Sequence, residues 1–216
     1  MYTGFKKVKG VKYFFRKTGK LGTKGAVYSS EWITVKDKKY YFNQNGSVNP
    51  NVMTEDEFIK KIGEMAREDM KKTGILASVT TAQAILESNY GTSILGMEAH
   101  NLFGMKATLS NNAWKSAWKG RTFRKLTWEV YGGKTVNIYA DFRAYDTFAE
   151  SLADHSAYLT GAKKPDGSLR YKGVVGCKKY KKAIQIIKNG GYATDPLYVS
   201  KIVNIIQRFK LTKYDK

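Results

Sequence analysis

The first fifty residues alternate between apolar and polar positions, and the pattern occurs twice. Residues 5–15 (FKKVKGVKYFF) align with residues 32–42 (WITVKDKKYYF) at a constant offset of 27 positions. A period of two is typical of half-buried strands, and Gly10 in the first copy and Asp37-Lys38 in the second predict a turn. Repeats of this length usually form small units that stack, so we expect two β-hairpin repeats here.

Beyond a turn-rich stretch at residues 43–53 the pattern changes to a helical period. Thr54 and Glu57 have the spacing of a capping box, and Gly74 ends the helix that they begin. The remaining pattern predicts strands joined by a turn at 131–134 within residues 122–145, and helices over 78–90, 147–161, 178–189 and 195–209. The sequence therefore predicts a repeat segment, residues 1–50, followed by a mainly helical domain with one hairpin, residues 51–216.

Composition narrows the choice of protein class. The chain has 216 residues, 42% of them hydrophobic, which excludes disorder throughout. No apolar run approaches the ~18 residues of a membrane span. Lys and Arg number 38 against 18 Asp and Glu, giving a net charge of +20. Such a chain is attracted to polyanions, which include nucleic acid, anionic membranes and bacterial wall polymers, and charge alone does not choose among them.

Most cofactor chemistry lacks a sequence basis. The chain has two histidines, His100 and His155, and one cysteine, Cys177, with no spacing typical of a metal site, phosphate loop or serine-hydrolase elbow. Cys177 precedes two lysines that would lower the pKa of a thiol, but neither histidine has the context of its partner base. We expect no metal and no cofactor, and a structural role for Cys177.

Glu87 differs from the other carboxylates. It lies in residues 80–91 (TTAQAILESNYG), which hold no other charge, at the edge of an apolar helical stripe. Partial burial disfavours the anion and raises the pKa, which is the state that a general acid requires near neutral pH. The alternative is an isolated glutamate on the flank of a helix.

Four separate stretches resemble one enzyme family. They are residues 84–93 (AILESNYGTS), 101–106 (NLFGMK), 140–145 (ADFRAY) and 191–198 (GYATDPLY). In this order they resemble glycoside hydrolase family 73, the bacterial peptidoglycan N-acetylglucosaminidases. The aromatic pattern of the first fifty residues is similar to the cell-wall-binding repeats of Gram-positive surface proteins. There the aromatic side chains either form only the hairpin core or also bind wall polymers.

The resemblance implies a fold, a reaction and a catalytic residue. The fold would be lysozyme-like α+β, with a helical lobe and a hairpin lobe enclosing a groove for a glycan strand. The reaction would be hydrolysis of the β-1,4 bond from N-acetylglucosamine to N-acetylmuramic acid, with Glu87 as general acid. Glu129 would be the second carboxylate, either a base in an inverting reaction or a supporting group if the substrate's acetamido group attacks. An exposed strand residue is the alternative for Glu129.

The resemblance and the chemistry of sugars together suggest binding residues. Aromatic rings cover the apolar faces of sugars, so we expect Phe103, Tyr145 and Tyr192 to form subsites and Asn101 to make a polar contact. For Phe103 and Tyr145 a core role is the alternative. The tryptophans at 114, 118 and 128 are further candidates for distal subsites.

Two other functions stay open at this point. A lytic transglycosylase uses the same broad fold and a single glutamate, and a protein that only binds cell walls would use the aromatic repeats without catalysis. We expect peptidoglycan strands and anionic wall polymers as partners, no nucleic acid, and a monomer. The chain begins without an apolar signal segment. We nevertheless expect a piece of a longer exported protein, located at the cell wall of a Gram-positive bacterium.

Overall fold

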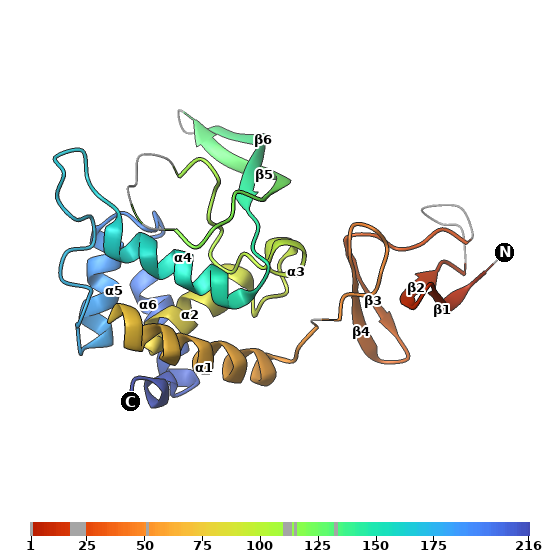
Figure 1. The fold of residues 1–216 in the computed structure, drawn as a ribbon, viewed down its shortest axis with the longest axis horizontal. Coiled ribbons are helices and arrows are strands. Elements are labelled where there is room, and N and C mark those ends of the chain that lie inside the picture. Colours follow the sequence, from red (N-terminus) through yellow and green to blue (C-terminus); the bar gives the residue numbers. More distant parts are fainter. Residues whose placement is uncertain (1, 18–24, 51, 110–113, 115, 132–133) are drawn as a thin grey trace. The chain divides into compact units, whose positions relative to one another are not determined.

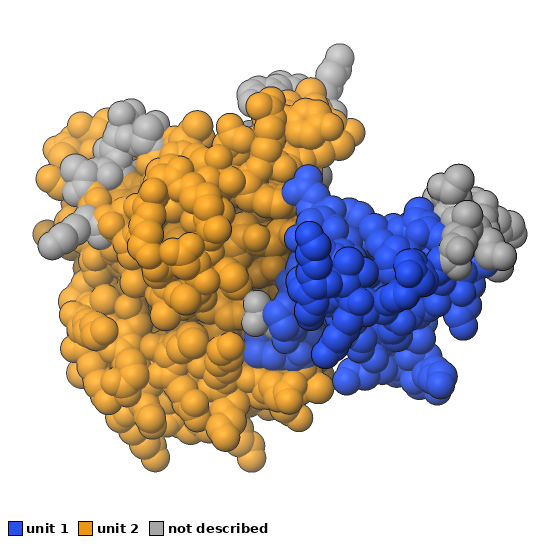
Figure 2. All heavy atoms as spheres, turned by 45° about the vertical axis from the view of Figure 1, so that its right-hand side comes forward, with its two compact units in different colours: residues 1–53 blue, residues 54–216 orange. Residues whose placement is uncertain are grey.

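The protein consists of two compact units, residues 1–53 and residues 54–216 (Figure 2). The computed structural model describes residues 2–17, 25–50, 52–109, 114, 116–131 and 134–216. Each unit has its own hydrophobic core, so each is described by itself.

Unit 1, residues 1–53, contains the two expected hairpins. Strands β1 (Gly4–Val8) and β2 (Val11–Phe15) pair antiparallel, as do β3 (Glu31–Val35) and β4 (Lys38–Phe42). The turns lie at Lys9-Gly10 and Lys36-Asp37, where all four residues have positive φ. That conformation suits two-residue hairpin turns, whose twist matches the twist of the strands. The 27-residue repeat is confirmed for the strands, and the second turn lies one residue before the expected Asp37-Lys38, because Lys38 already belongs to β4.

Aromatic side chains form the core of unit 1. Phe14, Tyr41 and Phe42 are buried, and the Phe14 ring lies 6.3 Å from the Phe42 ring, so the two hairpins share this core. Tyr2, by contrast, is 58% exposed. The aromatic side chains of the two repeats are buried or half-buried, so they pack within the hairpins, and Tyr2 precedes the first repeat.

Unit 2, residues 54–216, is mainly helical, with one hairpin that projects from the helices (Figure 1). Its elements are α1 (Glu55–Thr73), α2 (Ala77–Ser88), α3 (Ile94–Ala99), β5 (Thr122–Tyr131), β6 (Lys134–Arg143), α4 (Phe148–Gly161), α5 (Tyr180–Asn189), α6 (Tyr198–Arg208) and a short 3-10 helix, η1 (Leu211–Tyr214). The α+β expectation is confirmed. None of the helices among the described residues is long and apolar enough to cross a bilayer.

The caps of α1 and α4 follow the local sequence. Thr54 and Glu57 form the predicted capping box, and Gly74 ends α1 in the left-handed conformation. Thr147 caps α4 by accepting a hydrogen bond from the backbone N–H of Glu150. Helix α6 differs from the prediction, because it begins at Tyr198 and not at residue 195. Asp195 instead accepts a hydrogen bond from the N–H of Leu197 in the turn that precedes the helix.

Helix α2 lies at the centre of unit 2. Nearly all of its residues are buried, and it packs against α1, α5, α6 and η1. No side chain caps it from within its own segment. The Asp215 carboxylate does so from the end of the chain, by accepting a 2.7 Å hydrogen bond from the N–H of Ser78. A carboxylate there satisfies a free backbone donor and interacts favourably with the positive end of the helix.

The hairpin β5–β6 is regular over ten residue pairs, from Thr122 opposite Arg143 to Tyr131 opposite Lys134. The register confirms the pairing on either side of the expected turn, whose central residues 132–133 lie outside the described residues. At its base, the strand β6 is joined to residues 105–107, because the N–H groups of Arg143 and Ala107 bond to the carbonyls of Met105 and Asp141. The hairpin is therefore fixed to the loop that follows α3.

Candidate active site

An open groove of about 620 Å³ lies on unit 2. Its walls come from four segments that are far apart in the sequence: the end of α2, the loop at 103–109, α4, and the segment 192–201 that leads into α6. Glu87 and Asp195 are the acids among its lining residues. The groove thus joins three of the four sequence motifs, and the fourth motif, residues 140–145, is hydrogen-bonded to the loop at 105–107.

The end of α2 presents Glu87 to this groove. Glu87 is the residue before the end of the helix, and Asn89 and Tyr90 follow in the left-handed conformation. The Ser88 hydroxyl accepts a 2.7 Å hydrogen bond from the N–H of Gly91 and closes the turn. Gly91 has φ +73° and lies against the Phe58 ring, where a Cβ atom would come within 2.7 Å. The residues that follow Glu87 in this motif therefore form the turn at the end of α2, whereas Glu87 itself faces the groove.

The environment of Glu87 favours its protonated form. Its side chain is exposed along the groove, but protein surrounds the carboxyl group on its other sides. This desolvation raises the pKa of Glu87 to about 7, although a hydrogen bond from Tyr198 acts in the opposite direction. Glu87 therefore holds a proton through the mildly acidic range and can still lose it near neutral pH, as a general acid must.

Asn101 is buried and is not placed where we expected it. Its amide nitrogen donates to the carbonyls of Met105 and Arg143, at 2.9 and 2.8 Å. Its oxygen accepts from the N–H groups of Phe103 and Met105. All four hydrogen bonds are made within the protein, so Asn101 holds the loop in shape and has no free polar group to offer to a ligand.

Phe103 and Tyr192 both line the groove, and both contact a buried histidine. The Phe103 ring stacks on the imidazole of His155 at 3.8 Å, and the Tyr192 ring meets the same imidazole edge-on at 5.6 Å. Complete burial lowers the pKa of His155 to about 3, so the ring is neutral and serves as a packing surface. Phe103 is 6% exposed, which shows its core role, and it also lines the groove, so its contact with a sugar stays a prediction.

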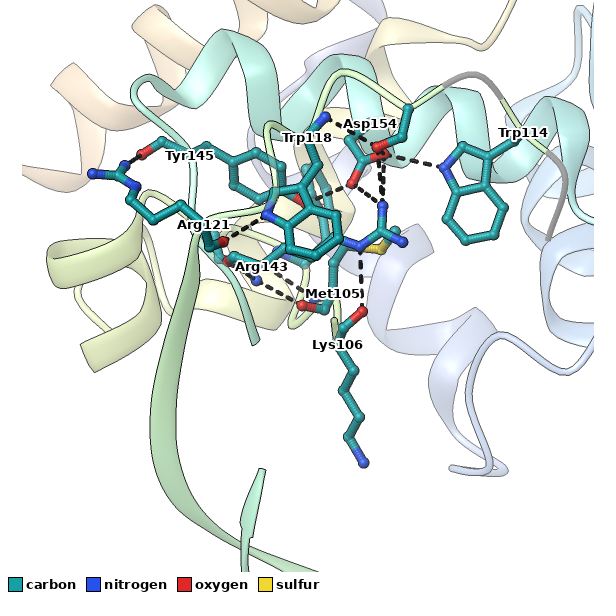
Figure 3. A network of polar contacts seen from close by, with 11 residues as sticks. Met105, Lys106, Trp114, Trp118, Arg121, Arg143, Tyr145 and Asp154 are labelled. Carbon is teal, nitrogen blue, oxygen red and sulfur yellow. Dashed lines mark hydrogen bonds and ion pairs between the residues drawn. The ribbon is translucent and has the colours of Figure 1, made fainter. Parts of the chain in front are cut away.

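Tyr145 lies in the core and takes part in the network shown in Figure 3, against our expectation of a subsite. Its hydroxyl donates to the Asp154 carboxylate at 2.7 Å. Asp154 also accepts from Ser116 and from the Trp114 indole, and it pairs with Arg143. Tyr145 is 1% exposed, so a sugar cannot stack on it.

Two of the three tryptophans belong to the same network. The Arg143 guanidinium lies 4.9 Å from the Trp114 ring and 4.8 Å from the Trp118 ring (Figure 3). The Trp118 indole donates to the carbonyl of Arg121 at 2.6 Å. Both tryptophans are half-buried and enclose an arginine at the base of the hairpin, a role that differs from the distal subsites we expected. The side chain of Trp128 lies outside the described residues.

Glu129 lies on strand β5, where its backbone pairs with Val136. Its side chain is among those that the structure does not describe. The sequence prediction for Glu129 therefore stays a prediction. The hairpin that carries it is the one whose base is held by Arg143 and Asp154.

Sequence reasoning did not single out Gln83 and Tyr198, although both interact at the site. Gln83 is buried one helical turn before Glu87, and its amide donates to the Tyr198 hydroxyl at 2.8 Å. A helical wheel places positions 83 and 87 on one face. Tyr198 is the last residue of a recognised motif, so both carried a signal that could have been used.

The other groups that we considered lie elsewhere. Cys177 lines a separate surface recess formed by residues 173–182. Within the described part of the chain, no three His, Cys, Asp or Glu side chains come together as a possible metal site.

Comparison with known proteins agrees with the geometry. The protein-family model described as mannosyl-glycoprotein endo-beta-N-acetylglucosaminidase matches residues 63–211. A second family model, described as a cell wall binding repeat, matches residues 3–21 and 30–48. Exo-glucosaminidase LytG of Bacillus subtilis is 38% identical over 74% of this chain and 53% of that protein. Peptidoglycan hydrolase FlgJ of Pseudomonas aeruginosa is 34% identical over 72% of this chain and 37% of that protein.

A solved structure shows the same fold. The catalytic domain of the autolysin Auto from Listeria monocytogenes matches with a TM-score of 0.65 and 36% identity, covering 77% of this chain and 92% of that one. The lysozyme-like fold and the resemblance of both segments are thereby confirmed. The chain spans about half or less of the two curated relatives described above.

Proposed function

This chain belongs to the glucosaminidase family, and on that premise we propose that it cleaves bacterial peptidoglycan. The bond broken is the β-1,4 link from N-acetylglucosamine to N-acetylmuramic acid. The observation that carries the proposal is Glu87, which faces an open groove with its pKa raised to about 7 by desolvation. The likeness to LytG and FlgJ supports the same reading.

Glu87 acts as the general acid. As the bond between the anomeric carbon and the leaving oxygen breaks, its electron pair goes to that oxygen, which takes the proton of Glu87. A water molecule then supplies the new oxygen on the anomeric carbon, and its proton goes to a base. A positioned acid of this kind typically contributes a factor of about 10²–10⁴ to the rate.

The second step has two routes within this proposal. Glu129 removes the proton from the attacking water and configuration is inverted, or the substrate's 2-acetamido group attacks first and configuration is retained. The first route needs carboxyl groups about 6.5–9.5 Å apart. A base role for Glu129 predicts that Glu129→Gln loses most activity. Azide should restore cleavage by taking the place of the attacking water, and the glycosyl azide should have the anomeric configuration opposite to that of the substrate.

Phe103 and Tyr192 form the sugar-binding walls of the groove. Both line it with aromatic surface, which suits the apolar faces of a glycan. Asn101 and Tyr145 act indirectly, Asn101 by holding the loop that carries Phe103, and Tyr145 by supporting the base of the hairpin.

The repeats bring the enzyme to its substrate. The first fifty residues carry eleven Lys and Arg against two acids, and the match to a cell wall binding repeat supports a role at the wall. Anionic wall polymers are the partners that this charge favours, in a salt-dependent manner. The setting that follows is the wall of a Gram-positive bacterium, where the protein acts as an exported monomer.

The test is Glu87→Gln, which keeps the shape of the side chain and removes its acidic proton. We expect lysis of purified walls to fall at least ~100-fold while co-sedimentation with walls is unchanged. Glu64→Gln, at an exposed position of α1, is the matched control and keeps full activity. Lysis by Glu87→Gln within about tenfold of wild type would exclude Glu87 as general acid.

A further inference from the structure

Gln83, Tyr198 and Glu87 form a polar cluster at the wall of the groove, with Gln83 buried beneath the other two. Gln83 and Glu87 lie four residues apart on α2, which places them on one helical face. Tyr198 is the first residue of α6. Its hydroxyl accepts a 2.8 Å hydrogen bond from the Gln83 amide. Tyr198 and Glu87 both line the groove, where the phenol acts on the carboxyl group as a donor that lowers its pKa. Gln83 and Tyr198 are 1% and 2% exposed, so the hydrogen bond between them is shielded from water.

The order of donors and acceptors among these three side chains decides how Tyr198 affects the pKa of Glu87. An amide nitrogen can only donate, so the oxygen of Tyr198 is the acceptor of the Gln83 bond and its own proton is free for Glu87. Burial, together with the nearby Glu87, raises the pKa of Tyr198 far above neutral, so the phenol keeps that proton. The order of donation is therefore Gln83 to Tyr198 to Glu87.

A hydrogen bond to one carboxyl oxygen affects the other. The oxygen that accepts from Tyr198 is disfavoured as a protonation site, so the acidic proton is carried by the second oxygen. A donor to a carboxylate also favours the ionised form. Tyr198 therefore both orients the proton of Glu87 and limits how far burial raises its affinity for that proton.

We propose that Tyr198 and Gln83 are positioning residues for the general acid: Gln83 fixes the hydroxyl of Tyr198, and Tyr198 fixes which oxygen of Glu87 carries the proton. The proposal rests on the proposed function, because it gives these two residues a role through Glu87. Neither residue needs to touch the substrate.

Other titratable groups share the groove and must be separated from this effect. Tyr192 precedes α6 and interacts electrostatically with Glu87. Lys106, Tyr158, Asp195 and Lys201 line the groove as well, and Asp195 and Lys201 pair with each other at 2.6 Å. Tyr158 offers the matched control, because its hydroxyl belongs to the same groove but accepts a 3.0 Å hydrogen bond from Tyr171.

The opposite orientation of the Gln83 amide would predict the opposite change in the pKa of Glu87, so the two orientations can be distinguished. With its nitrogen toward Tyr198, its oxygen is buried without a partner among the described residues. If the amide were turned, its oxygen would accept the proton of Tyr198, which could then only accept from protonated Glu87. Removing the Tyr198 hydroxyl would in that case lower the pKa of Glu87, whereas the proposed direction raises it.

The experiment measures kcat/KM against pH on a soluble peptidoglycan fragment for wild type, Tyr198→Phe, Gln83→Met and Tyr158→Phe. We expect the alkaline limb, set by loss of the Glu87 proton, to move up by about half to one pH unit in Tyr198→Phe. Gln83→Met moves it in the same direction by less and retains the phenol if Tyr198→Phe does not fold. Tyr158→Phe leaves the limb in place.

A limb that stays where it is, or moves down, in both Tyr198→Phe and Gln83→Met overturns the proposal. A ¹³C titration of the Glu87 carboxyl in the same variants reads the pKa without turnover. Failure of this inference and failure of the proposed function give different results. If Glu87→Gln is inactive while Tyr198→Phe has a wild-type profile, only this inference fails. If Glu87→Gln remains active, the proposed function fails with it.

Discussion

Arg143 and Asp154 form an ion pair of 2.8 Å, with 6% and 0% of their side chains exposed. Arg143 is the last residue of β6, and Asp154 lies in the middle of α4. The pair therefore fastens the base of the hairpin to the helical part of unit 2. Burial alone would raise the pKa of Asp154, but hydrogen bonds from Ser116, Tyr145 and Trp114, together with Arg143, lower it.

Asp154→Asn should strongly destabilise unit 2, because it leaves the Arg143 charge buried without a partner. Loss of one member of such a pair typically costs about 3–5 kcal/mol. Chemical denaturation at pH 7 measures this loss. Asp146→Asn is the control, since Asp146 forms an exposed pair with Lys119 and its loss should cost far less. A loss of under ~1 kcal/mol for Asp154→Asn would contradict the anchoring role.

The sign of the pH dependence follows from the lowered pKa of Asp154. A carboxylate with a folded-state pKa below its unfolded value stabilises the protein above the unfolded pKa, and that stability is lost as the pH falls through the folded value. The gap between wild type and Asp154→Asn should therefore narrow in acid. We expect it to be full at pH 7 and smaller near pH 3.

Glu87→Gln should have the opposite pH dependence. The pKa of Glu87 is raised to about 7 by desolvation, so the ionised carboxylate weakens the folded state as the pH rises from the unfolded value through 7. Glutamine removes that charge. We expect the Tm of Glu87→Gln to exceed that of wild type at pH 8.5 and to match it at pH 4. Equal differences at both pH values would mean that Glu87 is not desolvated.

Gly91→Ala tests the turn that presents Glu87. A left-handed residue with a side chain costs about 1–2 kcal/mol, and here the new Cβ also meets the Phe58 ring at 2.7 Å. Overpacking of this kind adds roughly 1–3 kcal/mol. Gly120→Ala is the control, because Gly120 also has positive φ but has nothing within 4 Å. If the two variants are equally stable, contact with Phe58 does not constrain the turn.

Asp215→Ala tests the cap that reaches α2 from the end of the chain. Loss of a helix N-cap typically costs about 0.5–2 kcal/mol, and the bond to Ser78 is part-buried. Asp166→Ala, at an exposed loop position where the carboxylate bonds only within its own turn, should cost less. Chemical denaturation compares the two variants. A smaller loss for Asp215→Ala than for Asp166→Ala would show that α2 does not depend on this cap.

The sequence predicted the elements whose signals are local. Thr54 and Glu57 specify the start of α1 within four residues, and the alternation around residues 131–134 specifies the hairpin. Helix α3 was missed, because six residues are too short to show a helical period. The start of α2 was placed one residue late, since its cap comes from Asp215, 137 positions away.

The same distinction explains which site residues were found. Glu87 stood out because its segment holds no other charge, which is visible in the sequence. Asn101 and Tyr145 belong to motifs too, but only their distant partners, the carbonyl of Arg143 and the carboxylate of Asp154, show that both side chains point into the protein. Tyr198 was not singled out for the same reason: its partner Gln83 lies 115 positions away, so the sequence does not show that the two side chains meet.

The most direct test of the account is mass spectrometry of the new reducing ends formed when purified peptidoglycan is digested by the wild-type protein, with Glu87→Gln as the blank. A hydrolase that cuts after N-acetylglucosamine predicts reducing-end N-acetylglucosamine, absent from the blank. Reducing-end N-acetylmuramic acid would contradict the proposed bond, and 1,6-anhydro-N-acetylmuramic acid would show a lytic transglycosylase instead.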